Sequence, residues 1–82
     1  MTNFPIGYKV IVASDVNERD GIGIEVYKDD KLLVEIFRDD TKQLRQISLH
    51  KRGLELHLIE ASIAAFKAEI PWDFIVDDGR AP

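Results

Sequence analysis

Apolar and polar residues alternate through much of the chain, and apolar residues then recur every three or four positions towards its end. Alternation indicates a β-strand with one buried face, because successive side chains of a strand point to opposite sides of a sheet. Ile22, Ile24 and Val26, for example, alternate with less hydrophobic neighbours. On this basis the pattern predicts four strands, at residues 6–13, 22–27, 32–38 and 43–49.

Short polar segments connect the predicted strands and determine how they pair. These connections lie at residues 14–20, 28–31 and 39–42. Consecutive strands joined by such turns are antiparallel neighbours, so the economical arrangement is a meander. The fourth strand is the least regular, because Leu44 is out of phase with Ile47 and Leu49. This phase change predicts a bulge, or a strand that begins near Arg45.

The stretch 54–70 has the period of a helix, and Pro71 would end it. Gly53 is the expected break before it. Five apolar residues lie at three- and four-residue spacing and predict the core-facing stripe. They are Leu56, Ile59, Ile63, Phe66 and Ile70.

These elements predict an α+β fold, a four-stranded antiparallel meander sheet followed by one C-terminal helix packed on one face. At 82 residues the chain has room for one core. Residues 1–75 are expected to form this single domain, and the small, polar residues 76–82 are expected to be a disordered tail.

Composition narrows the class of protein. The chain has no cysteine, which excludes disulfides and thiolate chemistry and fits a reducing cytoplasm. No apolar run approaches the roughly 20 residues of a membrane helix, and residues 1–5 lack the features of a signal peptide. The net charge of −4 argues against a purely electrostatic attraction to nucleic acid or lipid. We therefore expect a soluble cytoplasmic protein with no membrane partner.

The sequence contains no recognisable cofactor-binding or metal-binding motif. Gly21 and Gly23 begin a possible dinucleotide fingerprint, but Val26 occupies the place of its third glycine. Aspartate pairs recur at 29/30, 39/40 and 77/78. Two of these pairs fall in successive turns of the meander, at opposite ends of the sheet, where aspartate is favoured for local hydrogen bonds. The sequence thus predicts neither a cofactor nor a metal site.

Catalysis has equally little support. His50 and His57 are the only histidines, and no third group at fixed spacing makes them a ligand pair or a general base. The serines lack a nucleophile motif, and so small a domain has little room to enclose a substrate. We expect a protein that is not an enzyme.

Two surfaces are candidates for binding another protein or a second copy. One is the alanine-rich back of the helix, which fits either simple solvent exposure or a close packing partner. The other is the sheet face away from the helix. The candidate interface residues are Leu33, Phe37, Leu58, Ala61, Ala65 and Ala68.

Positive charge is concentrated in residues 38–52, which hold five basic and two acidic residues. Cations beside aromatic side chains on a sheet are the ingredients of single-strand binding, so a nucleic-acid-binding module is the alternative function. Glu25 and Glu35 share that face and could instead pair with the basic residues. The candidate nucleic-acid contacts are Tyr27, Phe37, Arg38, Lys42, Arg45, Lys51 and Arg52.

A strand sequence Ile47-Ser48-Leu49 that leads from an antiparallel sheet towards a helix resembles the single-stranded-DNA-binding fold of the positive cofactor four and whirly families. The resemblance would cover residues 21–70. It implies sheets that bind the strand and helices that build a homodimer. The basic segment that precedes the sheet in the coactivator has no counterpart here, so no site residue is carried over. The function that we predict is a small non-catalytic adaptor acting through protein–protein interaction or self-association.

Overall fold

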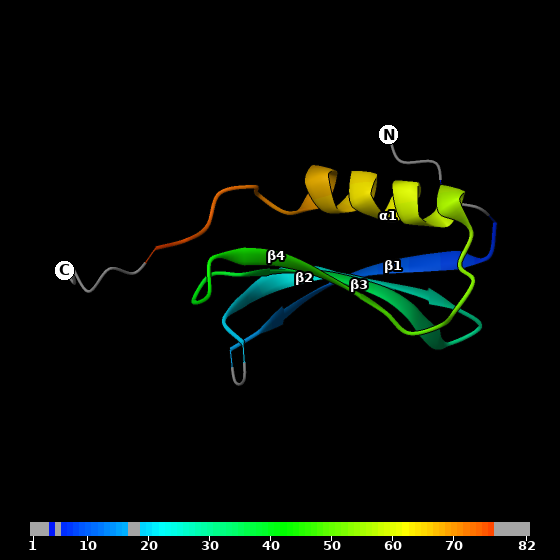
Figure 1. Ribbon diagram of the computed structural model, residues 1–82, viewed down its shortest axis with the longest axis horizontal. Coiled ribbons are helices and arrows are strands. Elements are labelled where there is room, and N and C mark those ends of the chain that lie inside the picture. Colours follow the sequence, from blue (N-terminus) through cyan, green and yellow to red (C-terminus); the bar gives the residue numbers. More distant parts are fainter. Residues whose placement is uncertain (1–3, 5, 17–18, 77–82) are drawn as a thin grey trace.

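The computed structural model describes residues 4, 6–16 and 19–76. Four strands form one sheet in the order β1 (Tyr8–Asp15), β2 (Gly21–Lys28), β3 (Lys31–Asp39), β4 (Leu44–Leu49). Every neighbouring pair is antiparallel. The helix α1 (Leu56–Glu69) lies across one face of this sheet (Figure 1). The predicted α+β meander with a C-terminal helix is confirmed, while the expected tail lies outside the described residues beyond Val76.

The hairpin between β2 and β3 is closed by two aspartates in the left-handed region. Asp29 and Asp30 have φ values of 51° and 63°, and Lys28 faces Lys31 across the turn. Two successive residues with positive φ form the tight turn whose twist matches that of the flanking strands, and aspartate tolerates this conformation better than most residues. The turn therefore holds β2 and β3 in register.

A β-bulge lies in β3, and it changes which face two leucines occupy. Val26 faces Val34, but the next residue, Tyr27, faces Leu32, so Leu33 is the extra residue. Leu33 consequently joins the core on the helix side of the sheet. Its expected place on the outer face is wrong, because strict alternation does not hold across a bulge. Of the two alternatives predicted for the fourth strand, the bulge is wrong and the strand that begins near Arg45 is confirmed, since β4 starts at Leu44 and pairs regularly with β3.

The helix begins and ends close to the predicted breaks. Gly53 has a φ of 69°, a conformation that favours glycine, and α1 starts three residues later without a side-chain cap. Ile70 is extended, and Pro71 follows it. Ile70 N–H still donates to the carbonyl of Phe66 at 2.9 Å, which closes the last turn.

The side of the helix that faces the sheet differs from the predicted stripe. Leu56 is 71% exposed and Ile63 is 40% exposed, although both belong to that stripe. The buried residues of α1 are Leu58, Ala61, Ser62, Ala65 and Phe66. Their centre is rotated from the centre of the predicted stripe by about 100°, the angle of one residue along a helix. Small residues at the contact let the helix axis approach the strands closely. The buried hydroxyl of Ser62 has a hydrogen-bond partner within the helix, because it donates to the carbonyl of Leu58 at 2.7 Å.

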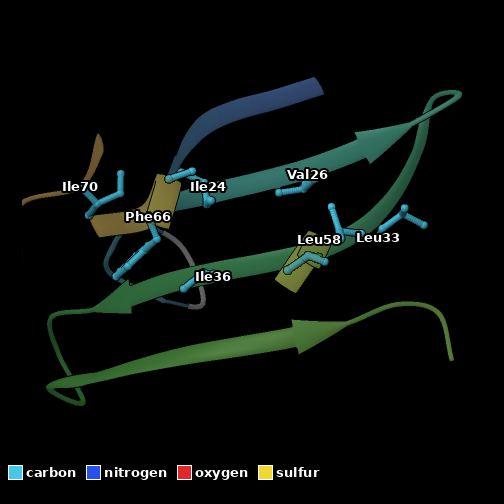
Figure 2. Packing of buried hydrophobic residues seen from close by; sticks show 9 residues of the cluster. Ile24, Val26, Leu33, Ile36, Leu58, Phe66 and Ile70 are labelled. Carbon is cyan, nitrogen blue, oxygen red and sulfur yellow. The ribbon is translucent and has the colours of Figure 1, made fainter. Parts of the chain in front are cut away.

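The core lies between α1 and the two central strands (Figure 2). Its fully buried members come from β2, β3, α1 and the residue that follows α1. On the β1 side, Phe4, Tyr8 and Val10 pack against its edge. No residue of β4 belongs to the core cluster. One helix is about as wide as two strands, so α1 covers the middle of the sheet and leaves β4 open.

Candidate functional site

An apolar groove runs between α1 and β4. Ile47 of β4 faces the core residue Ile36 of β3, so the side chains of alternate β4 residues point to the helix side of the sheet. Ile47 is 44% exposed and Leu49 is 57% exposed, although both are on the face that the helix partly covers. Ile59 of α1 lines a cavity together with Leu49, and Leu56 and Ile63 lie within about one helical turn of Ile59 on the predicted stripe. We call this surface the β4 groove and define it by Ile47, Leu49, Leu56, Ile59 and Ile63.

A shallow cavity of about 650 Å³ marks the end of the β4 groove nearest the start of α1. Leu49, Leu54 and Ile59 line it together with the loop 50–53. That loop carries the exposed basic residues Lys51 and Arg52. The groove therefore combines an aliphatic floor with a positive rim at one end.

The structure places the predicted helix interface mostly inside the molecule. Leu58 is 1% exposed, Ala61 is 6% exposed and Ala65 is 4% exposed, so the exposure expected of them is wrong. Ala68 alone of this set is exposed. The alanine-rich side is the side that packs on the sheet, because small side chains permit the close approach.

On the outer face of the sheet, Phe37 lies beneath an arginine. The guanidinium of Arg19 is 3.9 Å from the Phe37 ring centre, and it donates to both carboxylate oxygens of Glu35 at 3.0 and 2.9 Å. The hydrogen bond to Glu35 raises the pKa of Arg19 further above its ordinary value. With Phe37 only 3% exposed, its expected accessibility for binding is wrong.

Tyr27 is the candidate on this face that remains partly accessible. Its hydroxyl donates to Oε1 of Glu25 at 2.9 Å, and this bond to a carboxylate raises the pKa of Tyr27. The two glutamates of the outer face thus have partners, Tyr27 and Arg19, that lie outside the basic segment 38–52.

Two arginines of the basic segment hold the chain that follows α1. Arg38 is 2% exposed, pairs with Asp40 at 2.8 Å and donates to the carbonyl of Pro71 at 2.7 Å. Arg45 donates to the carbonyl of Trp72 at 2.7 Å and stacks on both Trp72 and Phe74, at 3.7 and 4.3 Å from their ring centres. These contacts bring Trp72 and Phe74 back over β4, and the Trp72 ring also meets the Phe66 ring edge to face.

The basic segment does not form one surface. Arg38 is buried and Arg45 lies on the helix side of the sheet beneath Trp72, whereas Lys42 is exposed in the turn before β4. Lys51 and Arg52 are exposed in the loop after β4. The structure therefore brings together neither the seven predicted nucleic-acid contacts nor the six predicted interface residues.

Within residues 4, 6–16 and 19–76, no three histidine, cysteine, aspartate or glutamate side chains are grouped as metal ligands. His50 lines the cavity after β4, and His57 is exposed in the first turn of α1. No helix in the described part of the chain is long and apolar enough to cross a membrane.

The residues that sequence reasoning missed as a surface are Ile47, Leu49, Leu56 and Ile63. The sequence does contain a signal for this surface, which is an excess of apolar side chains. The helix stripe and β4 together offer more aliphatic surface than one helix on four strands can bury. Comparison with known proteins adds no relative, because no family model, curated protein or solved structure matches the chain.

Proposed function

We propose that this chain is a non-catalytic accessory protein that acts by binding another protein through the β4 groove. One observation carries the proposal. Leu49 of β4 and Ile59 of α1 line one cavity, and Leu49 and the neighbouring residues Ile47, Leu56 and Ile63 remain 40–71% exposed. Aliphatic patches of this kind mark interaction sites more often than plain solvent-facing surface.

The chemistry of the groove describes its partner. Aliphatic side chains of an amphipathic segment would cover Ile47 and Ile63, which removes apolar surface from water and stabilises the complex. Lys51 and Arg52 at the rim favour acidic residues at one end of that segment. The alternative function, single-strand binding, requires Phe37 and Arg38 to be accessible, and their burial gives it no support.

The test compares two lysine substitutions on the helix side of the sheet. Ile63→Lys puts a charge into the β4 groove, and Val12→Lys puts the same charge on the β1 side at similar exposure, 48% against 40%. Both variants should fold, because neither residue is buried. We expect cross-linking of the purified chain in extract to yield partners that wild type and Val12→Lys share and that Ile63→Lys loses.

An acidic amphipathic peptide taken from such a partner should then bind wild type and show amide shifts at the β4 groove in a two-dimensional NMR titration. Identical cross-linked products from wild type and Ile63→Lys would overturn the proposal. So would peptide shifts confined to the outer sheet face around Tyr27.

A further inference from the structure

The main chain of β4 is open along one edge. β4 is the last strand of the sheet, and no described strand lies beyond it. His50 N–H donates to the carbonyl of Leu33 at 2.8 Å. Facing residues of an antiparallel pair alternate between hydrogen-bonded and non-hydrogen-bonded positions. The N–H and C=O groups of Arg45, Ile47 and Leu49 therefore point away from β3, towards the open edge.

This edge lacks the features that normally prevent strand addition. Its pairing with β3 has no bulge, and its sequence has no proline. Its one charged side chain, Arg45, is directed to the helix side and engaged by Trp72. The other edge strand, β1, carries the charged residues Lys9 and Asp15 towards its two ends.

We infer that a second copy of this chain pairs with the open edge, β4 against β4 and antiparallel, with a two-fold axis at Ile47. The strand suits its own reversed copy, because its three outward-pointing residues are spaced evenly about Ile47. With Ile47 opposite Ile47 of the second copy, Arg45 lies opposite Leu49, so all three outward residues find partners. A shift of two residues leaves one of them unpaired, and the central register places no like charges opposite each other.

The same pairing would extend the β4 groove, the apolar surface on which the proposed function rests. The inferred dimer does not depend on that function. The two Ile47 side chains would lie next to each other on the helix side. The two helices would be separated by four strand spacings, about 19 Å, and a helix is about 10 Å wide. The two β4 grooves would then form one trough between the helices, with Trp72 of each copy over Arg45 at either end.

Cysteine cross-linking tests the register directly, since the chain has no cysteine of its own. In the inferred dimer the two Cα atoms at position 47 are about 5.5 Å apart, within the range of a disulfide. Ile47→Cys should therefore form a disulfide-linked dimer under mild oxidation. Gln46 and Ser48 lie opposite each other between copies, so Gln46→Cys and Ser48→Cys should cross-link when mixed. Each alone should not, because identical positions are then about 7–8 Å apart.

Solution mass provides the second measurement. The wild-type chain should show twice its single-chain mass of 9.4 kDa by light scattering. Ile47→Pro removes an N–H that makes no bond to β3, so the monomer should stay folded while the dimer is lost. Ile47→Thr keeps the N–H and is the matched control that should remain dimeric.

Several outcomes would overturn the inference. They are a wild-type monomer at millimolar concentration, a dimer that persists in Ile47→Pro, and cross-linking by Ser48→Cys alone in place of Ile47→Cys. The Ile63→Lys variant separates this inference from the proposed function, because it should lose the partner protein and keep the dimer. A monomer that still binds the partner would overturn only the dimer.

Discussion

The rotation of α1 about its axis can be tested by removing two leucines that are two residues apart. Leu58 is 1% exposed and packs in the core, while Leu56 is 71% exposed on the β4 groove. Replacing a fully buried leucine by alanine costs about 2–5 kcal/mol. Full burial of a leucine is worth about 1.5–3 kcal/mol, and Leu56 has less than a third of its surface covered, so Leu56→Ala should cost about 0.5 kcal/mol.

A domain of this length is stabilised by about 4–12 kcal/mol, so the two variants should be easy to distinguish. Leu58→Ala should lower Tm by more than about 8 °C and Leu56→Ala by less than about 4 °C. Urea unfolding followed by circular dichroism gives the free energies, measured at a concentration where the mass is that of one chain. Equal costs for the two variants, or a larger cost for Leu56→Ala, would show that the predicted stripe faces the sheet and would refute the rotation described above.

Two further predictions concern the central strands. Gly23→Ala should destabilise the fold by about 1–3 kcal/mol or more, because the new Cβ would overlap the carbonyl oxygen of Ile36 in the neighbouring strand; unchanged urea unfolding would contradict this close approach. Tyr27 should titrate above the ordinary tyrosine pKa of about 10, since its hydroxyl bonds to Glu25. A raised pKa means that this bond contributes stability below about pH 10 and that the contribution is lost as the pH rises through the pKa of the folded state. The absorbance of tyrosinate measures the pKa of Tyr27, and the Tyr27→Phe variant assigns the signal. Glu25→Gln should bring this pKa back down.

Much of the fold could be predicted from the sequence, because the patterns that indicate it are local. Alternation in β2, the two turn aspartates and Pro71 each act over a few residues, so they predict the same structure in isolation and in context. The bulge at Leu33 could not be predicted in this way. Neighbouring leucines at 32 and 33 fit either face, and only the register between β2 and β3 decides which of them joins the core.

The candidate site was harder to predict, because its residues lie on separate elements. The stripe from Leu56 to Ile70 is a genuine apolar face, but a stripe does not specify what it packs against. The sheet instead receives the side that contains Ala61 and Ala65, where small side chains permit closer packing. Leu56 and Ile63 are left on the flank beside β4, where the sheet has no second helix to cover Ile47 and Leu49.

The sequence by itself determined the order of elements, the antiparallel meander and the end of the helix, since these depend on period, turn chemistry and proline. Tertiary structure decided the rotation of α1, the burial of Phe37 under Arg19 and of Arg38 beside Asp40, and the exposure of β4. Each of these depends on which surfaces meet across the fold. One helix can cover about two strands, and a local pattern cannot indicate which two.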